Sequence, residues 1–164
     1  ETMGAHVSAV PNEQNGRVTP LQTRAVVAMS GAFGYEMDLG KCTEEERKII
    51  RSQVEAYKAH YELIHNGDYY RLSPPGTDSL FTAWAHTSLN RREALVSLVT
   101  GGTRPAPPFC TLRLKGLDPT LNYRVQWDGG TAVYSGETLM RAGYPLPLFC
   151  GDYQSLQLYL SAEV

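Results

Sequence analysis

A single strand–loop–helix unit is encoded by residues 5–31, whose sequence is AHVSAVPNEQNGRVTPLQTRAVVAMSG. Residues 5–10 form a short alternating apolar run stopped by a proline, which predicts a buried strand. Thr19 and Pro20 resemble a helix N-cap followed by proline at the first helical position, and predict a helix over residues 21–29. One such unit cannot bury its own strand. The sequence therefore predicts a piece of a larger α/β domain.

A longer helix is predicted after a turn-rich stretch of mixed pattern at residues 33–39. Thr43 and Glu46 match the T-x-x-E capping box, in which each side chain accepts a hydrogen bond from the other residue's backbone N–H. Apolar residues then recur at spacings of three and four and predict a helix through about residue 65. This stripe consists of Ile50, Val54, Tyr57, Tyr61 and Ile64.

The periodicity changes at Asp68, where short alternating segments replace the helical patterns. Candidate strands cover residues 69–72, 80–87, 94–100, 109–115, 122–127, 132–134 and 154–160. Turn-forming residues separate these strands and no helical pattern lies between them, which predicts an antiparallel β-sandwich. The predicted fold class is therefore an α/β fragment at residues 1–67 followed by an all-β antiparallel sandwich domain at residues 68–164.

The composition is that of a globular protein. Of the 164 residues, 42% are hydrophobic and 20% are charged, and the formal net charge is −2. This near balance gives no indication of nucleic acid or an anionic membrane as a partner. No apolar run approaches the length of a membrane span and no signal peptide is visible; the compartment stays open, with the cytoplasm favoured over secretion.

The cysteines give no sign of a metal site or a disulfide framework. Cys42, Cys110 and Cys150 are widely spaced, and their number is odd. The sequence also contains no P-loop, dinucleotide fingerprint, HExxH motif or G-x-S-x-G elbow. We therefore expect neither a metal nor a cofactor.

Candidate catalytic groups are few. Glu36 and Asp38 are two residues apart, a spacing that does not place them across a bound sugar from each other. The acidic run at residues 44–46 belongs to a helix start. His60 and His65 are five residues apart on a helix, which does not align two metal ligands on one side.

His6 differs because of where it lies. If residues 5–10 form a barrel strand, its C-terminal end and the following loop lie at the face where such barrels place their active sites. His6, Ser8, Asn12 and Arg17 then become candidate residues at the rim of a substrate pocket. The alternative for His6 is a core residue that makes one hydrogen bond.

The sandwich segment allows two other functions. Its prominent aromatic residues are Trp84, Tyr123, Trp127, Tyr134 and Tyr153. Exposed aromatic faces can hold sugars, so a carbohydrate-binding module is one alternative, although aromatic residues on alternating strands by default pack in a core. A structural or oligomerisation module is the other alternative.

Several sequence blocks together resemble one family, and they follow one another in its order. They are MGAHVSAVPN at residues 3–12, GRVTPL at 16–21, AMSGAFGYE at 28–36, GDYYRL at 67–72, LDP at 117–119, YSGETLM at 134–140 and GDYQS at 151–155. These blocks are similar to the C-terminal part of the retaining α-galactosidases of glycoside hydrolase family 36. The resemblance covers essentially the whole chain, and its first forty or so residues are the most specific.

The resemblance implies an enzyme with an N-terminal β-domain, a central (β/α)8 barrel and a C-terminal β-sandwich. Residues 1–67 would hold the last βα unit and the C-terminal helices of the barrel, and residues 68–164 the sandwich. The family removes terminal α-linked galactose from melibiose- and raffinose-type sugars with two aspartates, a nucleophile and an acid/base. The motifs that carry both aspartates lie upstream of the first block, so no catalytic residue is assigned here and the chain alone is expected to be inactive.

The implied partners are the N-terminal and barrel portions of the same enzyme and a galactosyl oligosaccharide substrate, with a homo-oligomer of the full enzyme as a further option. Two related specificities stay open, those of an α-N-acetylgalactosaminidase and of a raffinose-type galactosyltransferase.

Overall fold

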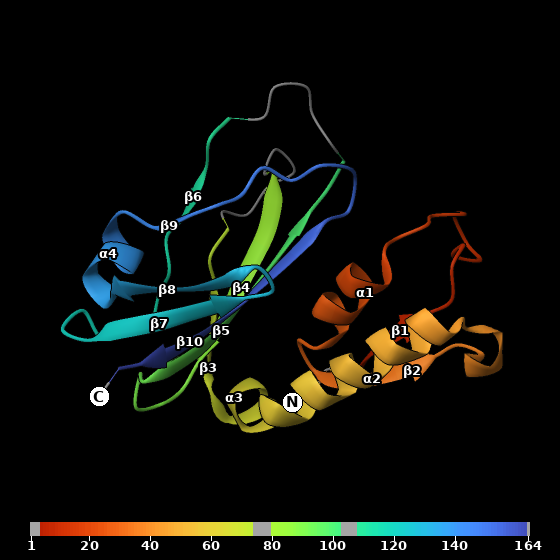
Figure 1. Ribbon diagram of the computed structural model, residues 1–164, viewed down its shortest axis with the longest axis horizontal. Helices are drawn as coiled ribbons and strands as arrows, with labels where there is room; N and C mark the ends of the chain where they lie inside the picture. The colour runs from red at the N-terminus through yellow and green to blue at the C-terminus, as the bar shows by residue number, and fades with distance from the viewer. Residues whose placement is uncertain (1–3, 74–79, 103–107, 164) are drawn as a thin grey trace.

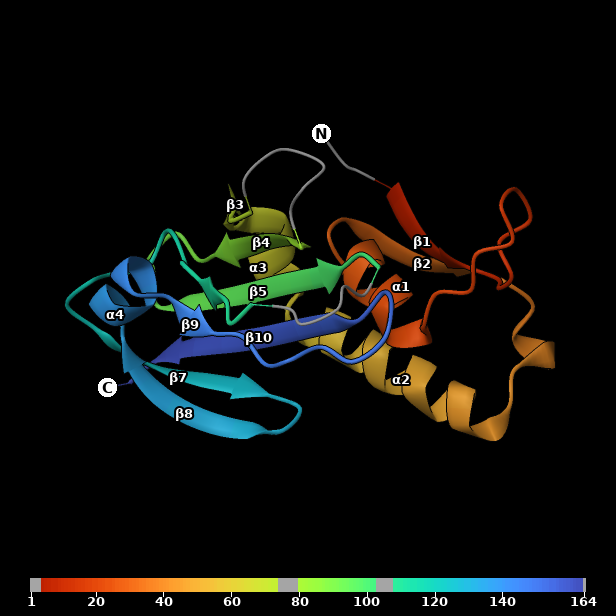
Figure 2. The same ribbon diagram turned by 90° about the horizontal axis from the view of Figure 1, so that it is seen from above.

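The computed structural model describes residues 4–73, 80–102 and 108–163. Figures 1 and 2 place a small α/β unit at one end of the molecule and a set of antiparallel strands at the other.

The α/β unit contains two parallel strands joined by a helix. Strand β1 (Gly4–Ser8) is followed by helix α1 (Leu21–Ala28) and strand β2 (Ala32–Glu36), and the two strands pair in parallel. The predicted strand and helix are confirmed, each slightly shorter than expected. The predicted cap is wrong, because Pro20 occupies the N-cap position and no side chain caps this helix. Strand β2 replaces the turn-rich stretch expected there, because pairing with β1 stabilises it.

Two helices follow where one was predicted. The capping box is confirmed: Thr43 Oγ1 accepts from the Glu46 N–H at 3.1 Å, and Glu46 Oε2 accepts from the Thr43 N–H at 2.8 Å. Helix α2 (Glu44–Ala59) follows the short 3-10 turn η1 (Leu39–Lys41), and α3 (Tyr61–Asn66) begins after a break at His60. The His60 ring lies 4.6 Å from the ring of Tyr159 on the sheet. This tertiary contact accompanies a break that the helical pattern could not indicate.

The strands of the second part form one six-stranded sheet in the order β3-β4-β5-β10-β7-β8, in which every neighbouring pair is antiparallel. Their bounds are β3 Asp68–Arg71, β4 Phe81–Thr87, β5 Glu93–Thr100, β7 Asn122–Trp127, β8 Gly130–Ser135 and β10 Ser155–Ala162. The predicted antiparallel sheet domain is confirmed.

The layer on one face of this sheet differs from the prediction. The strand expected over residues 109–115 is only β6 (Thr111–Leu112), which pairs with β9 (Tyr144–Pro145). The expectation of no helix among the strands is wrong, because α4 (Gly136–Arg141) follows β8 with Ser135 as its N-cap. Apolar residues from β6, α4 and β9 meet those of the sheet in the main core.

The other face of the sheet receives the helices. Helix α1 lies against β5 and β10, and α3 lies against β4 and β5. The buried Thr23 on α1 donates a hydrogen bond from Oγ1 to the Tyr153 carbonyl oxygen at 2.6 Å. A separate apolar cluster around Val7 and Ala25 forms the core of the α/β unit itself. The two parts of the chain thus have separate cores and direct polar contacts.

Candidate functional site

His6 lies at the middle of β1 and pairs with a carboxylate at the C-terminal end of the neighbouring strand. Its Nε2 is 2.5 Å from Glu36 Oε2, and the two side chains are 55% and 73% exposed. The alternative of a core histidine is therefore wrong. The pair links the middle of β1 to the C-terminal end of β2, which is the end at which the strands of a βα barrel carry the active site.

The loop after β1 is closed by hydrogen bonds from Asn12. The Asn12 N–H donates to the Arg17 carbonyl oxygen at 2.9 Å, and the Asn12 carbonyl oxygen accepts from the Gly16 N–H at 2.8 Å. Asn12 Oδ1 accepts from the backbone N–H groups of Gln14 and Asn15 at 3.1 and 3.2 Å. Gly16 has a φ of 70°, a left-handed conformation that favours glycine. The side chain of Arg17 therefore extends from a loop whose backbone is held by hydrogen bonds.

Arg24 fastens this loop to helix α1. Its guanidinium donates to the carbonyl oxygens of Ser8 and Thr19, the latter at 2.9 Å. Burial lowers the pKa of Arg24 below its usual range, with partial compensation from the Glu46 carboxylate. Arg24 was not among the residues predicted for the site. No sequence pattern indicates that its side chain turns back across the loop.

A hollow of about 130 Å³ lies within this loop. It is lined by Ser8, Ala9, Val10, Asn12, Asn15, Arg17, Thr19 and Arg24. It brings together three of the four predicted rim residues, whereas His6 lies outside it. The guanidinium of Arg17 lies 5.3 Å from the ring centre of Tyr153, so the sheet domain contributes an aromatic face to the same loop. Tyr153 was considered only as part of a sugar-binding sandwich.

The site offers hydrogen-bond donors and a cation but no catalytic carboxylate pair. Retaining glycosidases use two carboxyl groups about 5–5.5 Å apart. Glu36 is engaged by His6, and Asp38 Oδ1 accepts from the Gly40 N–H at 2.9 Å at the start of η1. Over residues 4–73, 80–102 and 108–163, no group of three or more potential metal ligands lies together. Nor is any helix in those ranges long and apolar enough to cross a membrane.

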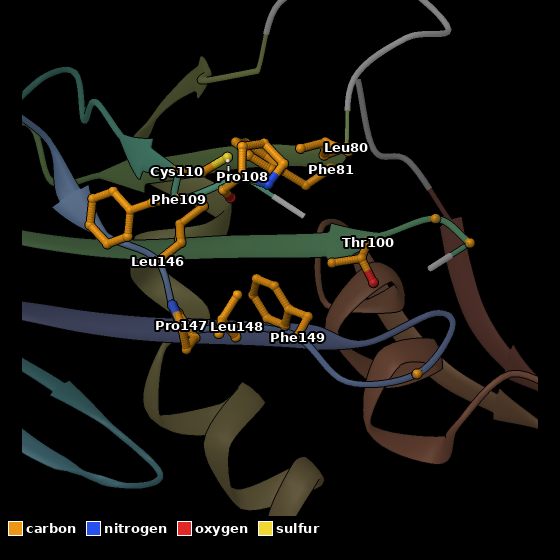
Figure 3. A pocket seen from close by; sticks show the side chains of 13 residues that line it. Leu80, Phe81, Thr100, Pro108, Phe109, Cys110, Leu146, Pro147, Leu148 and Phe149 are labelled. Atoms are coloured by element: carbon orange, nitrogen blue, oxygen red, sulfur yellow. Dashed lines mark hydrogen bonds between the residues drawn. The ribbon is translucent and has the colours of Figure 1, made fainter. Parts of the chain in front are cut away.

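A second hollow, of about 80 Å³, lies in the sheet domain beside the start of β4 and the C-terminal end of β5 (Figure 3). Its walls come from the chain on either side of β6 and β9 and are almost entirely apolar, with Phe81, Pro108, Leu146 and Phe149 among them. Sugars need several aligned polar partners, so this hollow does not suit a saccharide.

The aromatic residues of the sheet domain mostly serve its packing. Trp84 and Tyr123 are buried, and Tyr123 OH donates to the Arg91 carbonyl oxygen while accepting from the Asp118 N–H at 2.8 Å. Trp127 and Tyr134 pack against the main core. Of the five aromatic residues considered, these four therefore offer little support for a carbohydrate-binding surface.

Comparison with known families matches both parts of the chain. Residues 1–67 match the family model described as Melibiase, and residues 81–160 match the glycosyl hydrolase family 36 C-terminal domain. The chain is 45% identical, over 94% of its length, to the bifunctional α-galactosidase/sucrose kinase AgaSK of Mediterraneibacter gnavus. It is also 45% identical, over 98% of its length, to the α-galactosidase AgaA of Geobacillus stearothermophilus.

Solved structures give the same result. The crystal structure of the family 36 α-galactosidase AgaB from Geobacillus stearothermophilus superposes with a TM-score of 0.91 at 46% identity, covering 98% of this chain and 22% of that one. A variant of AgaA in complex with raffinose superposes with a TM-score of 0.92 at 44% identity and the same coverage. The chain spans only 16% and 21% of the two curated relatives, AgaSK and AgaA.

Proposed function

Because the chain belongs to glycoside hydrolase family 36, we propose that it supplies the last βα elements of the catalytic barrel and the C-terminal domain of a retaining α-galactosidase. The observation that carries this proposal is the parallel β1–α1–β2 unit. Two parallel strands cannot bury both of their faces and edges alone, and a barrel provides the neighbouring strands. In this proposal residues 1–67 belong to the barrel and residues 68–164 to the sandwich domain.

The proposed substrate is a sugar with a terminal α-linked galactose, of the melibiose and raffinose type. Relatives have been solved with raffinose and with stachyose. The two catalytic aspartates of such an enzyme lie in other parts of its barrel, and this chain contributes no nucleophile and no acid/base. Its contribution is to bind and orient the sugar.

The residues of the β1 loop are suited to that task. Arg17 carries a fork of N–H donors that can bind sugar hydroxyl groups. Asn12 uses its side-chain oxygen within the loop, so its NH₂ group is the part that can serve a hydroxyl. The His6–Glu36 pair extends the polar rim to β2. Because these side chains belong to no catalytic carboxylate pair, we expect them to bind the sugar to a similar extent in the ground state and the transition state, and so to act on substrate affinity.

The test is kinetic and uses the longer enzyme that contains this chain. Arg17→Leu should raise KM for raffinose about tenfold or more while changing kcat little, because a lost charged hydrogen bond costs about 1.5–3 kcal/mol of binding. Arg51→Leu, at an exposed position of α2, is the matched control. Turnover of an aryl α-galactoside by this chain alone, or an unchanged KM in Arg17→Leu, would contradict the proposal.

We also propose that the sheet domain stabilises the end of the barrel. The buried hydrogen bond from Thr23 to Tyr153 is the contact that favours this role. Thr23→Val should lower the thermal midpoint of the longer enzyme, whereas Thr131→Val on the exposed edge strand should not. Equal midpoints for the two variants would remove the support for this role.

A further inference from the structure

A hollow of about 450 Å³ lies beside α1 on the helix-bearing face of the sheet. It is lined by Val27, Ser30, Ile64, Gly67, Tyr69, Trp84 and His86. Its walls are mainly apolar, and two of the lining side chains are unusually open for their type: Tyr69 is 60% exposed and Val27 is 47% exposed. This hollow has no part in the sugar-binding loop described above.

His86 supplies the hollow with a buried polar atom that needs a hydrogen-bond partner. Its side chain is only 5% exposed, and its Nδ1 has no hydrogen-bond partner in the part of the chain that the structure describes. Buried polar atoms almost always have a partner in a complete protein. Burial and the nearby His65 lower the pKa of His86, so the ring is neutral at neutral pH and suits a hydroxyl or amide group rather than a carboxylate.

The positions of the helices indicate what covers the hollow. Helix α1 lies against β5 and β10, and α2 faces Trp127 at the end of β7. Figure 2 shows α2, β7 and β8 on one side of α1, and β1, β3 and β4 on the other. Neighbouring helices pack about 8–10 Å apart and strands about 4.8 Å apart. The distance between two neighbouring helices therefore equals about two strand spacings. A helix packed beside α1 on the side away from α2 would lie over β4 and β3.

Strand β1 has an unpaired edge on that side, since β2 is its sole partner among the described strands. In a βα barrel the helix that leads into a strand packs beside the helix that follows it. The solved relative AgaB is several times longer than this chain, which covers 22% of it. Such a protein has enough chain to supply a helix at this place.

We propose that the hollow lined by Tyr69, Trp84 and His86 receives the barrel helix that leads into β1, through an apolar face with one neutral hydrogen-bonding side chain directed at His86 Nδ1. This inference rests on the proposed role of the chain as part of a barrel enzyme. It adds a helix of the longer protein to α1 and α3, the helices that already lie on this face of the sheet.

The first test measures the accessibility of the hollow in the longer enzyme. Tyr69→Cys is compared with Leu89→Cys, a position 75% exposed in the β4–β5 turn, both in a background with Cys110→Ser and Cys150→Ser. A maleimide reagent is added and the labelled peptides are quantified by mass spectrometry. Tyr69→Cys should label at least about tenfold more slowly, because labelling there requires local opening.

The outcomes separate this inference from the proposed function. Equal labelling rates in an enzyme that still hydrolyses an aryl α-galactoside would overturn the docked helix and leave the proposed function intact. Lack of hydrolysis by the unmodified longer protein would instead overturn the proposed function. Protection that disappears on dilution would assign the surface to a second copy, and protection that requires added raffinose would assign it to a sugar; either result overturns the docked helix.

The second test examines the hydrogen bond. His86→Asn keeps a polar atom near the position of Nδ1, whereas His86→Phe removes it while keeping a ring. In the longer enzyme the Asn variant should retain more of the thermal midpoint than the Phe variant. Equal losses, or a larger loss in the Asn variant, would overturn the proposed partner for Nδ1.

Discussion

Replacing Arg24 with methionine should loosen the loop after β1 while leaving the rest of the fold in place. The methionine keeps most of the aliphatic volume, but removes the donors to the carbonyl oxygens of Ser8 and Thr19. Among the described side chains of α1, only that of Arg24 donates hydrogen bonds to both ends of the loop, at Ser8 and at Thr19. The change should therefore act locally, on residues 11–18.

The size of the effect follows from these two hydrogen bonds. A hydrogen bond to a charged group contributes about 1.5–3 kcal/mol, and burial of the guanidinium, which lowers the pKa of Arg24, offsets part of that. A net value of about 1 kcal/mol per bond gives about 2 kcal/mol in total, or about 30-fold in the opening equilibrium of the loop.

The assay is amide hydrogen exchange of the loop followed by mass spectrometry. The N–H groups of Asn12 and Gly16 are hydrogen-bonded within the loop and report its opening. Their exchange should accelerate about 30-fold in Arg24→Met, and not in the exposed α2 variant Arg51→Met. Unchanged exchange in Arg24→Met, or amides already unprotected in the unmodified chain, would refute the idea that Arg24 holds the loop.

Three further changes test the fold. Gly136→Ala should destabilise the sheet domain by about 1–3 kcal/mol in urea unfolding, because a Cβ there would lie 2.1 Å from a backbone oxygen, whereas Gly101→Ala has open space and should be nearly neutral. Thr43→Ala removes the capping box and should cost about 0.5–2 kcal/mol; an unchanged urea midpoint would contradict it. Burial and the Glu93 carboxylate raise the pKa of Tyr159 to about 12. The stability that the protonated Tyr159 contributes is therefore complete below about pH 10 and is lost between about pH 10 and pH 12. In urea unfolding measured at several pH values, Tyr159→Phe should show a smaller loss of stability over this alkaline range.

Local signals allowed much of the fold to be predicted. The capping box at Thr43 and the alternating strand of residues 122–127 depend on neighbours in sequence, and both have the expected form. Strand β2 could not be predicted, because its sequence AFGYE contains a glycine and its pairing partner lies beyond a helix. The break at His60 is accompanied by a contact with a ring from β10, about a hundred residues further on, which no local pattern indicates.

The candidate site was predicted to the same extent and for the same reason. Ser8, Asn12 and Arg17 line one hollow because a single short loop carries them. Arg24 and Tyr153 complete the site. Arg24 reaches the loop because its side chain turns back towards Thr19, and Tyr153 comes from the other end of the chain. No periodicity or motif spacing connects such residues before the chain has folded.

Tyr153 links the two roles proposed for this region, which are stabilisation by the sheet domain and sugar binding by the loop after β1. Tyr153 places its ring against Arg17 and accepts a hydrogen bond on its carbonyl oxygen from Thr23. A sheet domain that packs against α1 through Thr23 therefore also fixes the environment of a proposed sugar-binding residue. The structural role and the proposed binding role therefore meet in Tyr153, and we expect a change that weakens the contact between the sheet domain and α1 to alter the surroundings of Arg17 as well.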